Sequence, residues 1–197
     1  MSLPLCLASK ILKIKILLFE PNMVLGRGNK LFLNFCEKII CYSDSIINFP
    51  SKLKKKIVLI KPLLRKEFYS IKTNDFIKKE INLLIIGGSQ GAKLFDNTIK
   101  ESMIKLSKNY DIKVFQQTSI KNYENLKNFY TKHDIKNELF DFNDNVFKLM
   151  NKINICITRA GASTLAELSF LNIPYIAIPL TNSKDNHQFE NASFYEK

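Results

Sequence analysis

The chain has 197 residues, of which 46% are hydrophobic and 24% charged. These proportions are those of an ordinary folded protein and exclude collagen-like, low-complexity and disordered chains. The formal net charge is +12 at pH 7, and residues 1–66 alone carry +10 of it. Lysine supplies 27 of the 30 basic residues. The excess of positive charge is compatible with binding to a nucleic acid, with binding to an anionic membrane surface, or simply with a solvated lysine-rich face.

The cysteines and histidines argue against a metal site. Cys6, Cys36, Cys41 and Cys156 form no CxxC pair, and neither of the two histidines stands at metal-ligand spacing from them. We therefore predict buried, reduced thiols, no metal and no cofactor. No stretch reaches the roughly 18 apolar residues of a membrane span, and the start lacks the basic segment of a signal peptide. The expected location is cytoplasmic.

The first third of the chain alternates between helical and extended patterns. In chain order we predict a helix over 4–13, a strand over 14–19, a helix over 25–35, a strand over 38–42, a basic loop over 49–56 and a strand over 57–60. Residues 61–80 carry no convincing apolar period and are interpreted as a linker and the first helix of a second domain.

The remaining residues alternate strand and helix more clearly. We predict strands over 82–86, 112–116, 136–140, 153–157 and 175–178, and helices over about 93–107, 121–132, 144–150, 163–171 and 187–197. Strands such as 83–86, which are apolar throughout, are typical of a parallel sheet covered on both faces. The pattern predicts a doubly wound α/β fold, whose ligands bind beyond the carboxyl ends of the strands.

The first distinctive loop is Gly-Gly-Ser-Gln-Gly-Ala at 87–92, between a buried strand and a helix. Glycines allow close approach of the backbone to an anion, and the helix start offers free N–H groups. The loop has neither the P-loop sequence nor the dinucleotide-binding spacing. An anion-binding loop and a simple tight turn both remain open.

The second loop, residues 158–167, also joins a buried strand to a helix. Thr164 and Glu167 have the spacing of a capping box, in which Glu167 would serve only its own helix. A carboxylate one turn into such a helix can equally accept hydrogen bonds from a sugar diol. The residues alone do not decide between these two interpretations.

The third loop, residues 179–191, is rich in Asn, Gln and His, which suit neutral hydroxyl groups. Taken alone, His187 is more simply a surface histidine than a base, and His133 receives no role. No catalytic triad, paired carboxylates or metal cluster is recognisable. The sequence predicts binding groups for a phosphorylated, polyhydroxylated ligand.

These loops, in this order and spacing, resemble the MurG family, the UDP-N-acetylglucosamine–N-acetylmuramyl-(pentapeptide) pyrophosphoryl-undecaprenol N-acetylglucosaminyltransferases of bacterial peptidoglycan synthesis. The matching segments are 84–92, 159–167 and 184–192, with earlier matches at 2–5, 19–22, 26–30 and, more weakly, 61–65. The resemblance covers nearly the whole chain. It rests on the conjunction of motifs, since none of them is specific alone.

The resemblance implies a GT-B fold of type α/β, with an incomplete N-terminal Rossmann-like half and most of a second parallel-sheet Rossmann-like domain. Residues 1–66 would be part of the acceptor- and membrane-side domain, and 67–197 most of the UDP-N-acetylglucosamine domain. The family's first Gly-rich loop, which carries a His, and its closing C-terminal segment have no counterpart here. The chain therefore resembles a fragment, expected to be inactive alone, with its general base outside the chain.

The resemblance also assigns substrate-binding roles. Arg65 and Ser89 would approach the diphosphate, main chain at Phe142 and Asn143 the uracil, and Glu167 the ribose hydroxyls. The implied binding set is Asn22, Arg65, Ser89, Asn143, Ala162, Ser163, Thr164, Glu167, His187, Gln188 and Asn191. The first turn at 162–164 would line the nucleotide pocket, the residues at 187, 188 and 191 would contact the sugar, and Asn22 would face it across a cleft.

The implied reaction is an inverting transfer of N-acetylglucosamine from UDP-N-acetylglucosamine to lipid-linked N-acetylmuramyl-pentapeptide, which forms lipid II. The implied location is the cytoplasmic face of the bacterial inner membrane, where an anionic surface would attract residues 1–66. Two departures stand out: Pro21 replaces a Gln, and His187 stands where many members have Gln. The alternatives are a non-catalytic UDP-sugar-binding remnant, another GT-B transferase or, less favoured because Arg is scarce, a nucleic-acid binder.

Overall fold

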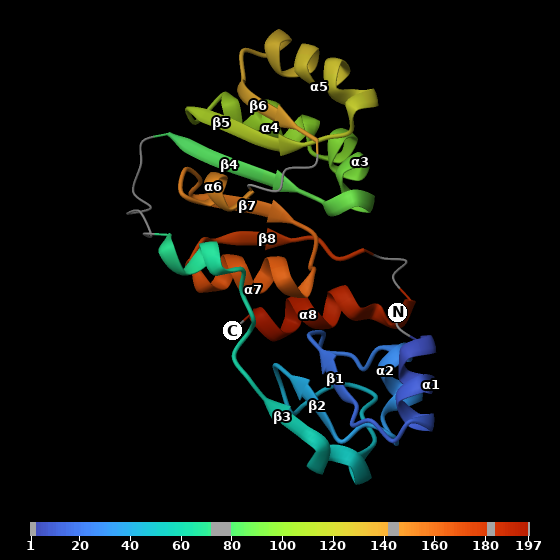
Figure 1. Cartoon of the computed structure of the whole chain (residues 1–197). Coiled ribbons are helices and arrows are strands. Elements are labelled where there is room, and N and C mark those ends of the chain that lie inside the picture. Colours follow the sequence, from blue (N-terminus) through green and yellow to red (C-terminus); the bar gives the residue numbers. More distant parts are fainter. Residues whose placement is uncertain (1–2, 72–79, 142–145, 181–183, 197) are drawn as a thin grey trace. The chain divides into compact units, whose positions relative to one another are not determined.

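The computed structural model describes residues 3–71, 80–141, 146–180 and 184–196 (Figure 1). They form two compact units. Unit 1 consists of Met1–Leu63, Gly161–Ala166 and Thr181–Lys197, and unit 2 of Leu64–Ala160 and Glu167–Leu180. These units follow contacts within the chain, so the domain boundary between residues 66 and 67 stays a prediction.

Unit 2 is built on a five-stranded sheet in the order β6-β5-β4-β7-β8, and every pairing in it is parallel (Figure 1). Its strands are β4 (Ile81–Ile86), β5 (Ile112–Gln117), β6 (Lys136–Phe140), β7 (Ile155–Thr158) and β8 (Tyr175–Ala177). The predicted parallel α/β fold is confirmed. Strand β7 begins two residues later than predicted, since Asn154 pairs its backbone and side chain with Asn82 instead of entering the apolar run.

Both faces of this sheet carry an apolar core. Leu83 and Ile85 point into one cluster, together with residues of α3 (Gly88–Thr98), α4 (Lys100–Ser107) and α5 (Ile120–Lys132). Leu84 points into the other, with residues of the 3-10 helix η2 (Lys66–Ser70), α6 (Val146–Met150) and the second half of α7 (Ala162–Phe170). The continuous apolar pattern of β4 thus follows from burial on two sides.

Unit 1 contains a three-stranded parallel sheet in the order β1-β2-β3. Its elements are α1 (Leu3–Ile11), β1 (Leu17–Glu20), α2 (Arg27–Phe32), β2 (Lys38–Cys41), the 3-10 helix η1 (Ser51–Lys56), β3 (Ile57–Leu59), the 3-10 helix η3 (Lys184–Asn186) and α8 (His187–Tyr195). Leu18, Ile39 and Ile57 face a single core cluster. On the opposite face Leu17 and Phe19 are exposed.

Several predicted elements differ from the structure in their bounds. The strand predicted over 14–19 begins only at Leu17, the residue that pairs with the first residue of β2. The helix predicted over 93–107 starts earlier, at Gly88, and is interrupted at Ile99, which separates α3 from α4. The interruption follows a run of Asp, Asn and Thr, which are weak helix formers.

Cys36, Cys41 and Cys156 are buried free thiols, as predicted, while Cys6 is half-buried. Burial, with a smaller contribution from the Glu20 charge, raises the pKa of Cys41 to about 11. Within the described ranges, no helix is long and apolar enough to cross a membrane.

Candidate functional site

The carboxyl edge of the unit 2 sheet contains a topological switch point. After β4 the chain adds β5 and β6 on one side, and then crosses to place β7 and β8 on the other. Ile86 pairs with Thr158, so Gly87 and Arg159 leave neighbouring strands side by side. Open parallel sheets bind ligands at this position, which makes it the first candidate site.

Backbone N–H groups of the Gly-rich loop face an oxygen of the protein itself. The side-chain Oε1 of Gln117 accepts hydrogen bonds from Gly88 N at 3.0 Å and from Gly87 N at 3.3 Å. Gly88 has a φ of +65°, a conformation that residues with a side chain rarely adopt. The loop therefore presents two backbone donors to one acceptor, and the binding of an anion there remains a prediction. Gln117 was not predicted, because its distance along the chain hides the contact.

Two predicted residues lie outside this description. The side chain of Ser89 is outside the described part of α3, and Asn143, with Phe142, falls in a segment that the structure does not describe. Their predicted contacts with the diphosphate and the uracil remain predictions.

Arg65 and Glu167, both in unit 2, are brought together. Arg65 Nε donates to Glu167 Oε1 at 3.1 Å, and Nη2 donates to Oε2 at 3.4 Å. Glu167 is only 8% exposed. Burial raises the pKa of its carboxyl group, and the Arg65 guanidinium opposes that shift. A buried carboxylate held by one flexible cation can exchange that partner for another hydrogen-bond donor.

The capping-box interpretation of Glu167 is wrong. Helix α7 begins at Ala162, so Thr164 lies inside its first turn rather than at the N-cap. The Glu167 oxygens are engaged by Arg65. The first intrahelical hydrogen bond runs from Leu165 N to Gly161 O, so the N–H groups of the predicted residues Ala162, Ser163 and Thr164 have no acceptor within the helix.

Arg159 is a buried cation that the motif contained but to which the sequence assigned no role. It is 8% exposed, and its Nη1 donates to Ile178 O at 2.9 Å and Pro179 O at 3.1 Å. Its guanidinium lies 5.1 Å from the Phe95 ring centre. Among the described residues, its Nε has no hydrogen-bond partner, and burial lowers its pKa. Arg159, which follows β7, thus binds the backbone that follows β8, where the third loop begins.

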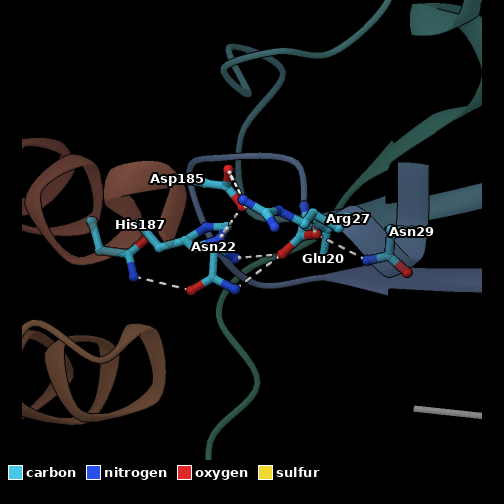
Figure 2. Close-up of polar contacts among 8 residues, drawn as sticks. Glu20, Asn22, Arg27, Asn29, Asp185 and His187 are labelled. Carbon is cyan, nitrogen blue, oxygen red and sulfur yellow. Dashed lines mark hydrogen bonds and ion pairs between the residues drawn. The ribbon is translucent and has the colours of Figure 1, made fainter. Parts of the chain in front are cut away.

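Unit 1 contains a second polar cluster, organised by Glu20 (Figure 2). Glu20 is 2% exposed and occupies an inward position at the end of β1. Its Oε2 accepts hydrogen bonds from Gly26 N at 2.7 Å and Asn29 Nδ2 at 2.9 Å, and its Oε1 accepts one from Asn22 Nδ2 at 3.0 Å. Glu20 was not among the predicted site residues, because the predicted strand ended at Phe19 and left Glu20 in the turn that follows.

The predicted residues Asn22 and Asn191 meet in this cluster. Asn191 is 1% exposed, its Nδ2 donates to Asn22 Oδ1 at 3.0 Å, and its Oδ1 accepts from Met23 N at 3.0 Å. Asn191 therefore joins α8 to the loop after β1. The predicted sugar contacts of both residues remain predictions.

His187 and Gln188 form the first turn of α8, and both are half-buried. His187 Nε2 lies 3.7 Å from Asp185 Oδ2 (Figure 2). Its Nδ1 is buried and has no hydrogen-bond partner among the described residues. The contact of His187 with the sugar remains a prediction.

Two other features of the described residues bear on the choice of site, namely a pocket elsewhere in unit 2 and the absence of metal-binding groups. A pocket of about 400 Å³ in unit 2 is lined by Asp111, Ile112 and Lys136, at the amino ends of β5 and β6, away from the switch point. The described ranges contain no group of three or more His, Cys, Asp or Glu that could hold a metal ion.

The comparisons identify the class of protein. Residues 82–197 match the model of the glycosyltransferase family 28 C-terminal domain. The chain belongs to this family of glycosyltransferases.

Two curated relatives carry a more specific name than the family model does. The chain is 59% identical over 197 residues to the UDP-N-acetylglucosamine--N-acetylmuramyl-(pentapeptide) pyrophosphoryl-undecaprenol N-acetylglucosamine transferase of Pelagibacter ubique (strain HTCC1062), covering 100% of this chain and 55% of that protein. It is 35% identical to the enzyme of the same name from Rickettsia typhi (strain ATCC VR-144 / Wilmington), covering 94% and 57%. The chain thus spans about half the length of the curated relatives it matches.

The fold is also found in solved structures. Acinetobacter baumannii MurG superimposes with a TM-score of 0.75 at 24% identity, covering 97% of this chain and 53% of that one. Arabidopsis thaliana UGT89C1, solved with UDP-L-rhamnose, superimposes with a TM-score of 0.59 at 12% identity, covering 96% and 52%. These similarities support the predicted GT-B type of α/β fold.

Proposed function

We propose that the chain is part of a glycosyltransferase that moves N-acetylglucosamine from UDP-N-acetylglucosamine to lipid-linked N-acetylmuramyl-pentapeptide, and that unit 2 binds the UDP portion. The observation that carries the proposal is the buried Glu167 carboxylate, held by Arg65 in the helix that follows β7. Similarity to the named transferases of Pelagibacter and Rickettsia supports the choice of substrates.

In this proposal the ligand replaces contacts within the protein. The ribose hydroxyls donate to Glu167, which releases Arg65 to approach the diphosphate. The diphosphate also meets N–H groups of the Gly-rich loop, where Gln117 Oε1 now accepts two hydrogen bonds. Ser89 and Asn143 complete the diphosphate and uracil contacts. For the sugar, the proposed contacts are His187, Gln188, Asn191 and Asn22, all of unit 1.

The proposed reaction inverts configuration at the sugar. The 4-hydroxyl of the N-acetylmuramyl group attacks C1 of N-acetylglucosamine as the bond from C1 to the diphosphate oxygen breaks, and UDP leaves. Helix N-termini and fixed donors stabilise the charge that develops on the departing diphosphate. We assign no general base to a residue of this chain.

Unit 1 has features that suit the cytoplasmic surface of an anionic membrane, which we propose as a partner. Leu5 is 69% and Ile11 78% exposed on α1. The adjoining pocket, of about 290 Å³, is lined by Lys10, Lys13 and Lys15 among others. Exposed apolar side chains beside lysines favour binding at an anionic interface. Binding to anionic but not zwitterionic vesicles, reduced by changing the three lysines to Gln, supports this part; equal binding to both contradicts it.

Isothermal titration calorimetry of the whole chain with UDP-N-acetylglucosamine tests the proposed function. We expect saturable binding of UDP-N-acetylglucosamine and UDP, weaker binding of ADP, and a loss of about tenfold in affinity for Glu167→Gln, since a hydrogen-bonded carboxylate contributes about 1.5 kcal/mol. A folded chain that binds neither uridine nucleotide contradicts the proposal. Glu138→Gln, on β6, is the matched control and should bind normally.

A second candidate is a UDP-sugar-binding protein without turnover. It is favoured by the described site, in which the buried Glu167 and its partner Arg65 are suited to binding a nucleotide and to neither of which we assign the role of general base. A turnover assay with lipid-linked acceptor, run on a chain whose UDP binding has been established, separates the two: product formation excludes this candidate.

A further inference from the structure

A short turn in unit 1 precedes α8, and it has an unusual backbone. Asp185 has φ 67° and ψ 12°, and Asn186 has φ 56° and ψ 23°, so two successive residues occupy the left-handed region. Residues with side chains rarely adopt this conformation, although Asp and Asn tolerate it best. A contact from outside the turn can stabilise this conformation further. The next residues are His187 and Gln188.

Arg27 is the group that holds this turn. Its Nε donates to Asp185 Oδ2 at 2.9 Å, and its Nη2 donates to Asp185 Oδ1 at 3.0 Å (Figure 2). The two residues are 158 positions apart but belong to the same compact unit. A two-bond fork fixes the orientation of a carboxylate as well as its position, which a lysine ammonium does not.

The backbone beside Arg27 is itself anchored. Arg27 is the first residue of α2, and the preceding Gly26 donates its N–H to the buried Glu20 carboxylate at 2.7 Å. A Cβ on Gly26 would lie 3.0 Å from Glu20 Oε2, so only glycine allows this close approach without displacement of the carboxylate. The backbone that carries Arg27 is thus held by Glu20, and the Arg27 guanidinium binds the Asp185 carboxylate in the turn before α8.

We propose that Arg27 is a positioning residue: it holds the Asp185–Asn186 turn in its left-handed conformation and so orients His187 and Gln188 towards the sugar of the donor. Arg27 acts through Asp185 and does not itself touch the ligand. This inference rests on the proposed function for the nature of the ligand. Its structural part, that Arg27 supports the first turn of α8, stands separately.

The proposal is tested on the whole chain with Arg27→Gln, Arg27→Lys and Asp185→Asn. The matched control is Glu37→Gln, which removes an exposed ion pair to Lys15 in the same unit. Hydrogen exchange of the backbone amides of residues 190–192 reports the order of α8. Calorimetry with UDP-N-acetylglucosamine and with UDP separates contacts to the sugar from contacts to the nucleotide.

For Arg27→Gln and Asp185→Asn we expect faster exchange at 190–192 and an affinity for UDP-N-acetylglucosamine lower by about fivefold, in keeping with an exposed ion pair. UDP affinity should change by less than about twofold. The exchange rates and sugar affinity of Arg27→Lys should fall between those of wild type and Arg27→Gln, and those of Glu37→Gln should match wild type. High salt should bring the exchange rates and the sugar affinity of wild type towards those of Arg27→Gln, since salt screens exposed ion pairs.

Wild-type exchange and wild-type sugar affinity in Arg27→Gln would overturn the inference and leave the proposed function intact. Equal losses for UDP and UDP-N-acetylglucosamine would also overturn it, because the effect would then not concern the sugar. If the wild-type chain binds neither ligand, the proposed function fails. The sugar-orienting role then falls with it, while the exchange data still decide whether Arg27 supports α8.

Discussion

The two parallel sheets of this chain differ in how many of their faces are covered. In unit 2, Leu83 and Leu84 point to opposite faces and each enters a buried cluster. In unit 1, Leu18 is buried while its neighbour Leu17 is 62% exposed. Both strands are apolar in sequence. Apolar strands therefore predict a two-sided core only where helices cover both faces, as the α/β crossovers of unit 2 do.

The candidate sites differ in the same way. In unit 2 the polar groups follow parallel strands whose order determines a switch point, so the topology brings them to one edge. In unit 1 the polar cluster depends on particular long-range pairs, such as Arg27 with Asp185. The first kind of site follows from the fold, and the second from individual side chains.

The largest expected contrast is between core and exposed positions of the two sheets. Leu84→Ala, at a fully buried position of β4, should lower the free energy of unfolding by about 2–5 kcal/mol, because it removes apolar contacts and leaves a cavity. Leu17→Ser should change it by less than about 0.5 kcal/mol. Urea unfolding measures both. Equal losses would show that the outer face of β1 is buried in solution.

A smaller loss is expected from the buried polar network of unit 2. Asp96 is 1% exposed and accepts hydrogen bonds from Gln116 Nε2, Thr118 Oγ1 and Asn122 Nδ2 at 2.8–3.0 Å. Asp96→Ala should cost about 3 kcal/mol, since it leaves buried donors without an acceptor. Asp96→Asn, which keeps one oxygen, should cost less. A thermal melt in which the two variants unfold together would contradict this order.

The polar cluster of unit 1 should respond to a single added methyl group. Gly26→Ala places a Cβ 3.0 Å from Glu20 Oε2 and should cost about 1 kcal/mol through displacement of the carboxylate. Gly161→Ala is the control, since its Cβ would meet Thr164 Oγ1 at 3.9 Å and its φ is not positive. In chemical denaturation, the free energy of unfolding of this control should be close to that of wild type. A neutral Gly26→Ala would show that the Glu20 cluster is loosely packed.

The smallest expected effect is a pH dependence of UDP binding. Burial raises the pKa of Glu167 above its ordinary value of 4.5, and Arg65 opposes the shift. The ribose needs the ionised carboxylate, so UDP affinity should fall as the pH is lowered through the raised pKa. Arg65→Met removes the opposing charge and should move this fall to higher pH. Glu167→Gln should abolish it, as calorimetry across pH 4–8 can establish.

The same shift has the opposite sign for stability. Because the folded protein binds the Glu167 proton more tightly than the unfolded chain, the contribution of Glu167 to the free energy of unfolding decreases as the pH rises from 4.5 through the raised pKa. Stability that instead increased across this window, after subtraction of the Glu167→Gln curve, would contradict the assigned direction.

The sequence predicted the strands of unit 2 well, because runs such as β4 are apolar on both sides and end at glycine. It placed the helix after β4 too late, since a glycine-rich segment carries no apolar period even where it is helical. Glu167 was recognised as a candidate, but its partner Arg65 is 102 positions away and no local pattern predicts such a pair. Gln117 and Arg159 were missed for the same reason, whereas Glu20, whose partners lie two to nine positions away, was assigned to a turn.

The most direct test of the central claim is to map UDP binding by amide chemical shifts on the whole, isotopically labelled chain. The claim is that the edge of the unit 2 sheet between β4 and β7 binds UDP. It predicts that the largest changes in amide chemical shift on addition of UDP fall in residues 87–91 and 159–167. Shifts confined to the pocket around Asp111 and Lys136, or none in a folded chain, would contradict it.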